Sequence, residues 1–216
     1  MPGPPGFFHH LRIDDMSHRQ PKCALRILNQ TTAPARLRFR CGGLLVWDTW
    51  AAAGGILTVP KMGERDIQAM AILHDPRTGV AYSLPSTLAR NGVRLVAAIS
   101  VDQGAERFGI EQEACEHLHH LCLLNLTAMD VHCSLHFPES PFHMKVVVAP
   151  QAEQLIKLSD MTVTATVEGI TLATLPIRHW DGDILISSSR LDEQPYPNMT
   201  FATSDAHGFP RARHVF

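Results

Sequence analysis

Short apolar stretches with a period of two, separated by turn residues, constrain the fold of this chain more than any other feature. Residues 67–73 are the clearest case, because apolar and polar side chains alternate through them. Successive side chains of a strand point to opposite faces, so this alternation is typical of half-buried strands. With 216 residues, of which 45% are hydrophobic, the chain is long enough to bury its own core. The sequence therefore predicts an all-β protein.

Turn residues divide these stretches into hairpins. Asn91-Gly92 is a strong turn signal, because both residues tolerate the positive φ of a type I′ turn. Together with the loop Asp75–Gly79, it predicts a meander of three strands over residues 67–73, 80–84 and 93–101.

A similar order of elements recurs later in the chain. Residues 161–167, 170–175 and 184–187 are extended stretches, separated by Glu168-Gly169 and Asp181-Gly182. This recurrence favours two related β units, and so a duplicated fold, over hairpins that simply recur in any all-β chain. The predicted organisation is an N-terminal arm (1–21), a first unit (22–126), a second unit (127–190) and a C-terminal arm (191–216).

Residues 111–125 fit a helix or a strand. Apolar residues at the spacing of one helix face predict a short helix that ends near His120 and is followed by a strand; they are Ala114, Cys115, Leu118, Leu121 and Cys122. The run 121–126 fits a buried strand equally well.

The motifs between residues 22 and 104 carry a resemblance to a known family. In order they are Ala33-Pro-Ala-Arg36, Gly42-Gly-Leu-Leu45, Ile56-x-x-Val-Pro60, Gly63-x-Arg65, Ser86-Thr-Leu-Ala-Arg-Asn-Gly92 and Val93–Gly104. This order resembles the dUTPase and dCTP-deaminase superfamily. The resemblance implies dUTPase-like units of jelly-roll or β-barrel type, which form oligomers with active sites between subunits.

The resemblance also implies roles for individual residues. Ser86, Arg90 and Gly92 would bind the phosphates of a nucleotide, since hydroxyl, guanidinium and backbone N–H groups donate to phosphate oxygens. Asp102 would activate the attacking water, and Mg²⁺ would hold the triphosphate. An active dUTP pyrophosphatase is therefore one predicted function.

Several positions depart from the family pattern. Pro85 stands where the family has its phosphate-binding arginine, and Gly43-Leu44-Leu45 lacks the metal-associated aspartate. Without a gap, Val101 takes the place of the catalytic aspartate, and no glycine-rich arm ends the chain. The preferred prediction is a protein without catalysis or cofactor, similar to the dUTPase-related proteins of herpesviruses, that binds host or viral proteins.

Composition limits the kinds of partner and the cellular compartment that we expect for this chain. A formal net charge of −2 argues against nucleic acid, and no apolar run reaches the ~18 residues of a membrane span. The first residues lack the apolar stretch of a secretion signal, so we expect an intracellular protein, cytoplasmic or nuclear, with its five cysteines reduced. The Asn-x-Thr frames at Asn29, Asn125 and Asn198 are then not expected to carry glycans.

Two further side-chain groups are candidate sites. Trp47, Trp50 and Trp180 lie near predicted turns, where aromatic residues act either as interface anchors or as caps on the core. His136 and His143 become cross-strand partners if residues 137–142 form a hairpin, which would place their Cβ atoms about 5 Å apart. A metal-binding β module is therefore a further alternative, beside an ordinary polar surface.

Overall fold

The computed structural model describes residues 25–63, 66–75, 77–84, 86–180, 182–191, 194–204 and 210–212. The predicted N-terminal arm, Pro85 and Asp181 lie outside these residues. The described residues form strands and no helix, which confirms the all-β class. None of them belongs to a helix that is long and apolar enough to span a membrane.

The strands follow one another along the chain as β1 (Leu25–Asn29), β2 (Ala35–Cys41), β3 (Leu44–Ala51), β4 (Ile56–Val59), β5 (Ile67–His74), β6 (Ala81–Ser83), β7 (Thr87–Ala89), β8 (Val93–Asp102), β9 (Ala105–Ala114), β10 (Leu121–Asn125), β11 (Val131–His136), β12 (His143–Val148), β13 (Glu153–Ile156), β14 (Met161–Val167), β15 (Ile170–Thr171), β16 (Leu175–Pro176), β17 (Gly182–Leu191), β18 (Gln194–Ser204) and β19 (Pro210–Ala212).

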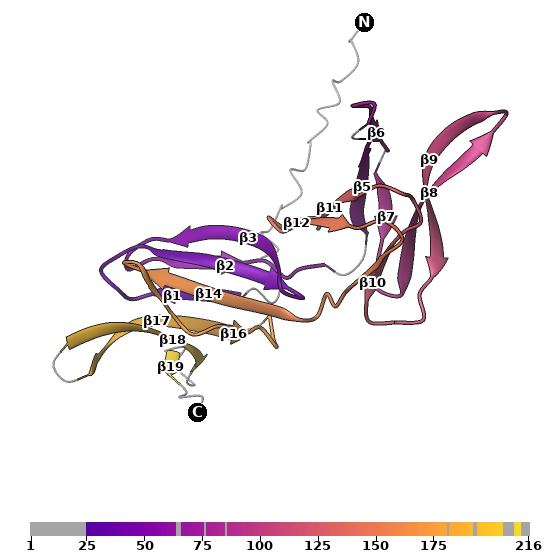
Figure 1. Cartoon of the computed structure of the whole chain (residues 1–216). Coiled ribbons are helices and arrows are strands. Elements are labelled where there is room, and N and C mark those ends of the chain that lie inside the picture. The colour runs from indigo at the N-terminus through magenta and orange to yellow at the C-terminus, as the bar shows by residue number, and fades with distance from the viewer. Residues whose placement is uncertain are drawn as a thin grey trace, which may run out of the picture.

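Two lobes of paired sheets make up the molecule (Figure 1). Lobe one joins the sheet β19-β18-β17-β1-β4 to a sheet of β14, β2 and β3, with β15 and β16 beside β14. Lobe two joins the sheet β13-β10-β8-β9 to a sheet of β12, β11 and β5, with β6 and β7 beside β5. Because side chains alternate along strands such as β5, each sheet buries one face in the core.

The two lobes have the same strand order, because a nine-strand unit occurs twice. We call β1–β9 repeat one and β10–β18 repeat two. In repeat one β5 is followed by two short strands that pair with it and then by the hairpin β8–β9, and β14 to β18 repeat this order. The duplicated arrangement expected from the recurring turns is therefore present.

The repeats exchange strands. β5 of repeat one pairs with β11 of repeat two, and β14 of repeat two pairs with β2 of repeat one. Likewise β8 lies parallel to β10, whereas β17 lies parallel to β1. Each lobe thus contains four strands of one repeat and five of the other. The predicted boundary between residues 126 and 127 lies between β10 and β11, inside repeat two.

A buried asparagine marks the end of the first strand of repeat one. The Asn29 side chain is 1% exposed, and its Nδ2 donates to the carbonyl oxygens of Ala33, Ala51 and Ala52 at 2.9, 3.2 and 3.0 Å. Its Oδ1 accepts from the amide and the hydroxyl of Thr31 at 3.1 and 2.7 Å. One side chain therefore joins the end of β1 to the end of the β2–β3 hairpin.

The same network recurs at the end of β10 in repeat two. Asn125 is 0% exposed and donates to the carbonyl oxygens of Met129, Val148 and Ala149 at 2.7, 2.9 and 3.1 Å. Its Oδ1 accepts from the amide and the hydroxyl of Thr127 at 2.9 and 2.7 Å. The frames at Asn29 and Asn125 are therefore internal structural motifs, because neither side-chain amide is accessible to a sugar.

A half-buried ion pair also joins the repeats in lobe one. Asp183 of β17 is 2% exposed and receives two bonds of 2.7 Å from the guanidinium of Arg26 on β1. Such bidentate pairs are the stronger kind of charged contact, and the buried carboxylate requires its partner. This contact fixes the register between the parallel strands β1 and β17.

Three predictions about local structure are wrong. Residues 111–114 belong to β9 and not to a helix, because pairing with β8 overrides the helical spacing of the apolar residues. The third strand of the expected meander, β8, lies in the other sheet of its lobe. Residues 194–204, expected in an arm, form β18 and pair with β17.

The Asn-x-Thr networks yield a test of stability. We expect Asn29→Ala and Asn125→Ala each to lower the free energy of unfolding by about 3 kcal/mol, because several buried carbonyl groups lose their donor. Denaturant unfolding followed by circular dichroism measures this loss. Gln30→Ala is the matched control, since Gln30 is exposed, and equal midpoints for all three variants would contradict the interpretation.

The exchanged strands yield a second test. We expect a chain cut between Leu118 and His119 to remain one particle in size-exclusion chromatography after reduction, because both repeats supply strands to both sheets of each lobe. Residues 25–118 produced alone should be insoluble or should associate. Separation of the cut chain into two compact monomers would show that each half folds by itself.

Candidate functional site at the base of the β8–β9 hairpin

A cavity of about 640 Å³ lies at the base of the β8–β9 hairpin in lobe two. The turn Arg90–Gly92, between β7 and β8, forms one wall. Gln112 and Glu113 of β9 form a second wall, and Leu118 and His119 of the following loop form a third. The turn before β8, the end of β9 and the loop between β9 and β10 thus meet at this place.

Backbone contacts fix the shape of the cavity. The Gly92 amide donates to the carbonyl oxygen of His120 at 2.9 Å, and the Cys115 amide donates to the carbonyl oxygen of Gly92 at 2.9 Å. Gly92 has a φ of 76°, which a side chain would strain. A disulfide between Cys115 and Cys122 closes the loop that carries His120. The expectation of reduced cysteines is therefore wrong for this pair. Cys115 follows β9 and Cys122 lies in β10, so the short loop between the two strands brings the two thiols together.

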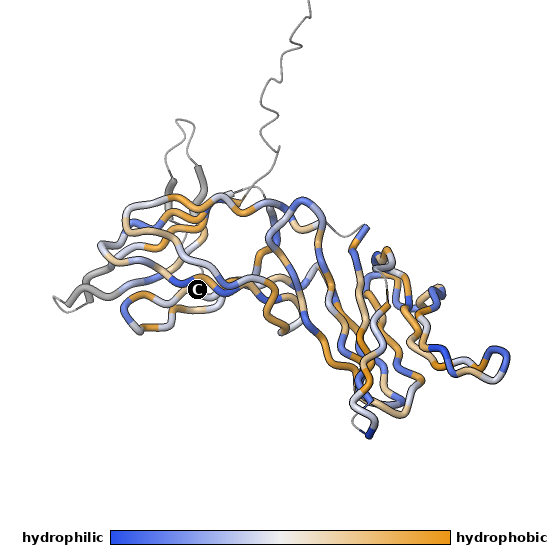
Figure 2. The backbone as a smooth tube through the Cα atoms, turned by 90° about the horizontal axis from the view of Figure 1, so that it is seen from above, coloured by the Kyte–Doolittle hydropathy of each residue, from blue (hydrophilic) through white to orange (hydrophobic). Residues whose placement is uncertain are grey.

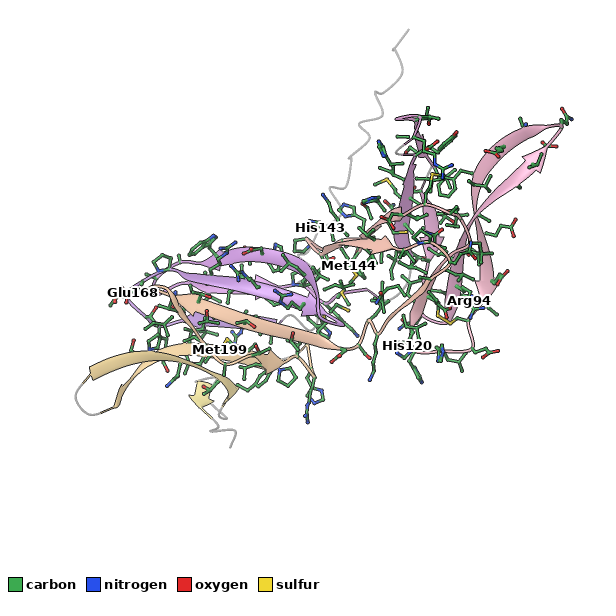
Figure 3. The ribbon with its side chains drawn as sticks, viewed as in Figure 1. Arg94, His120, His143, Met144, Glu168 and Met199 are labelled. Atoms are coloured by element: carbon green, nitrogen blue, oxygen red, sulfur yellow. A yellow bond between two sulfur atoms is a disulfide. The ribbon has the colours of Figure 1, made fainter. Side chains whose placement is uncertain are left out.

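Polar and charged groups line the cavity. The Gln112 side-chain amide donates to the Thr87 hydroxyl at 2.8 Å and to the carbonyl oxygen of Leu88 at 2.6 Å, so this side chain is held across to β7. Glu113 lies 4.0 Å from the guanidinium of Arg94. Figure 3 shows Arg94 and His120 in this part of lobe two.

Arg94 is shared with a further acidic residue outside the cavity. Its Nε lies 2.9 Å from a carboxylate oxygen of Glu153 on β13, much closer than its contact with Glu113. Glu153 is therefore the principal partner of Arg94, and Glu113 contacts this guanidinium only at the edge of ion-pair distance.

The structure brings together only two of the residues predicted to bind a nucleotide. Arg90 and Gly92 line the cavity. Ser86 is exposed before β7, about 13 Å from Arg90 along an extended chain, and does not line it.

Asp102 lies at the far end of β8. This strand has ten residues, so at about 3.3 Å per residue it carries Asp102 roughly 30 Å from Gly92. There the carboxylate is 52% exposed and lies 3.2 Å from a guanidinium nitrogen of Arg107. Figure 2 shows the hydrophilic tip of this hairpin extending away from the apolar strands.

The three tryptophans have different environments. Trp47 is half-buried and stacks on Phe39 with ring centroids 5.1 Å apart. It also meets Phe142 edge-on at 5.5 Å, and Phe142 meets Trp180 at 5.9 Å. Because Phe142 comes from lobe two and Phe39 from lobe one, this cluster packs the lobes against each other. Trp47 and Trp180 therefore serve the core.

Trp50, in contrast, is 58% exposed on the outer face of β3. Its cross-strand neighbour is Arg36 on β2. Arg36 donates to both carboxylate oxygens of Asp48 at 2.9 and 2.7 Å, which holds the pKa of Asp48 below its usual value. Arg38 lies 3.7 Å from the same carboxylate. Trp50 thus stands beside a face with more positive than negative charge.

His136 and His143 are cross-strand partners on β11 and β12, as the hairpin predicts. Figure 3 shows His143 at the end of β12 that is nearer to lobe one. Both side chains are exposed, and Lys145 on the same face adds positive charge. No group of three or more His, Cys, Asp or Glu residues suited to a metal occurs among the described residues.

Cys41 and Cys133 are buried and lie outside the Cys115–Cys122 disulfide. The Cys41 thiol donates to the carbonyl oxygens of Lys157 and Leu158 at 3.4 and 3.5 Å. Burial raises the pKa of the Cys133 thiol to about 11, which keeps it protonated and unreactive near neutral pH.

Sequence reasoning missed Gln112, Glu113 and His119 as neighbours of Arg90. The available signal was the dipeptide Gln103-Gly104, whose φ values of 50° and 81° form the tight turn between β8 and β9. Reading residues 111–120 as a helix hid this hairpin. No family model, no curated protein and no solved structure matches the chain.

Proposed function

We propose that this chain is a non-catalytic binding protein on a degenerate, duplicated dUTPase-like scaffold, which acts through contacts with host or viral proteins. The observation that carries the proposal is the separation of Asp102 from Arg90 and Gly92 by roughly 30 Å of strand. A general base must lie within hydrogen-bond reach of the water that attacks a phosphate held elsewhere in the site. Within one copy of the chain, the residues implied for the two tasks lie at opposite ends of β8, so a single copy cannot bring them into one site.

Exposed aromatic surface supports a binding role. Trp50 is largely exposed, although a side chain of this size is usually buried, and Arg36 lies beside it. Tryptophan and arginine are the residue types that most often carry binding energy in protein interfaces. Of the three tryptophans predicted as anchors, Trp50 is therefore the one that fits.

A dUTP pyrophosphatase is the second candidate, because Arg90 shares its cavity with a carboxylate, that of Glu113. In this alternative Glu113 would take the place of Asp102 as the base, and Mg²⁺ would supply charge neutralisation for the phosphates. The arrangement lacks a second carboxylate among the cavity residues, which is why binding is the preferred function.

An assay of dUTP with Mg²⁺ separates the two candidates. We expect no pyrophosphate release above the blank from the wild-type chain, and no difference for Asp102→Ala or Glu113→Gln. An enzyme-coupled assay for pyrophosphate measures the rate of its release from dUTP. Turnover by the wild type that disappears in either variant would overturn the non-catalytic proposal.

Photo-cross-linking tests the binding role. We expect benzoylphenylalanine introduced in place of Trp50 to form discrete adducts with a protein partner in cells that produce the chain. The matched control is the same amino acid in place of Ile170, an apolar residue of lobe one that is 50% exposed. Equal adducts at both positions, or none at position 50, would count against Trp50 as an anchor.

A further inference from the structure

The internal duplication allows the two hairpins β8–β9 and β17–β18 to be compared position by position. Asn125 pairs with Ala97 and Asn29 pairs with Ile186, so Ala97 and Ile186 are equivalent. Counting along the hairpins makes Thr203 of β18 the counterpart of Ala114 of β9. The comparison shows what one repeat has and the other lacks.

The outer edge of β18 is covered. β19 pairs with it in antiparallel orientation, and the central pair is Thr203 with Arg211. Pro195 and Pro197 lie at the outward-facing positions of β18, where a missing N–H prevents further pairing. Both devices protect a strand edge from other chains.

The outer edge of β9 has neither device. Within the described residues β9 pairs with β8 alone, and its sequence contains no proline. The Cys115 amide donates to Gly92 on the β8 side. Because facing directions alternate along an antiparallel ladder, the backbone groups of Ala114 and Gln112 point to the free edge. The open edge of β9 therefore begins at Ala114, whose counterpart in β18, Thr203, is covered by β19. Ala114 also lines the cavity.

Charge indicates what the edge accepts. β9 carries Glu106, Glu111 and Glu113 against Arg107, and Arg107 is paired with Asp102. A second β9 placed alongside would bring glutamates together, which disfavours pairing between two copies. A basic strand is complementary, and β19, the strand on the equivalent edge, has the sequence Pro-Arg-Ala.

We propose that the edge of β9 around Ala114 binds an extended, Lys- or Arg-containing segment of a partner protein as an added antiparallel strand. Main-chain hydrogen bonds to Gln112 and Ala114 supply affinity, and Glu111 and Glu113 select for basic side chains. The adjoining cavity, lined by Arg90, accommodates side chains of the added strand. This proposal rests on the binding role above but concerns a different surface from that of Trp50.

A fluorescent peptide with the sequence of residues 208–216 is the probe, because it contains β19 and two arginines. We expect fluorescence polarisation to give a dissociation constant below about 100 µM for the full chain. Ala114→Pro, which removes one outward N–H, and Glu113→Lys should each weaken binding at least tenfold. A peptide with Arg211→Glu and Arg213→Glu should not bind.

Glu106→Lys is the matched control, because it makes the same charge change near the other end of β9 and should leave the affinity within twofold. Melting temperatures of all variants verify folding, and Glu113→Lys keeps the test valid if Ala114→Pro unfolds. Failure of the peptide to bind, or equal binding to the wild type and to both edge variants, overturns the proposal. If one of these results occurs and dUTP is not hydrolysed, only the proposal for the β9 edge is overturned, and the non-catalytic function stands. If dUTP is hydrolysed, the proposed function is overturned, and the peptide-binding result is judged by itself.

Discussion

The buried Asn-x-Thr networks are the constraint on which the rest of the architecture depends. Each asparagine ends the first strand of a repeat and holds carbonyl groups of the next hairpin, at a place that water does not reach. The neighbouring residues Gln30 and Leu126 then donate to Ile186 and Ala97, which belong to the other repeat. The networks therefore set the position at which the exchanged strands join, and both lobes inherit the same geometry.

Exchange of strands has a consequence for the functional surfaces. Each lobe needs strands from both repeats, so the strand order is the same in the paired sheets of the two lobes. The edges and outer faces of the sheets are not bound by this requirement, and there the two lobes differ. One lobe presents Trp50 beside arginines, whereas the other presents the open edge of β9 and the cavity beneath it. These differences are the features that a duplicated scaffold can use for separate contacts.

Local sequence reasoning succeeded where the signal was local. Alternation in β5 and β14 and the turns that end at Gly79 and Gly169 were readable, because side-chain period and positive φ depend on neighbouring residues. It failed for residues 111–114, where pairing with β8 decided the conformation. The pairing of His136 with His143 followed from the geometry of a hairpin. The order of the family motifs along the chain, in contrast, did not indicate that Asp102 lies far from Gly92.

The sequence by itself determined that the chain forms β-strands, where several of its turns lie and that its order of elements recurs. Only the tertiary structure decided which strands pair, that the repeats exchange their halves, and which predicted residues share a site. The physical reason is that a strand satisfies its backbone hydrogen bonds through partners far away in the chain. Residue type and spacing select the strand, but the choice among distant partners depends on the whole core.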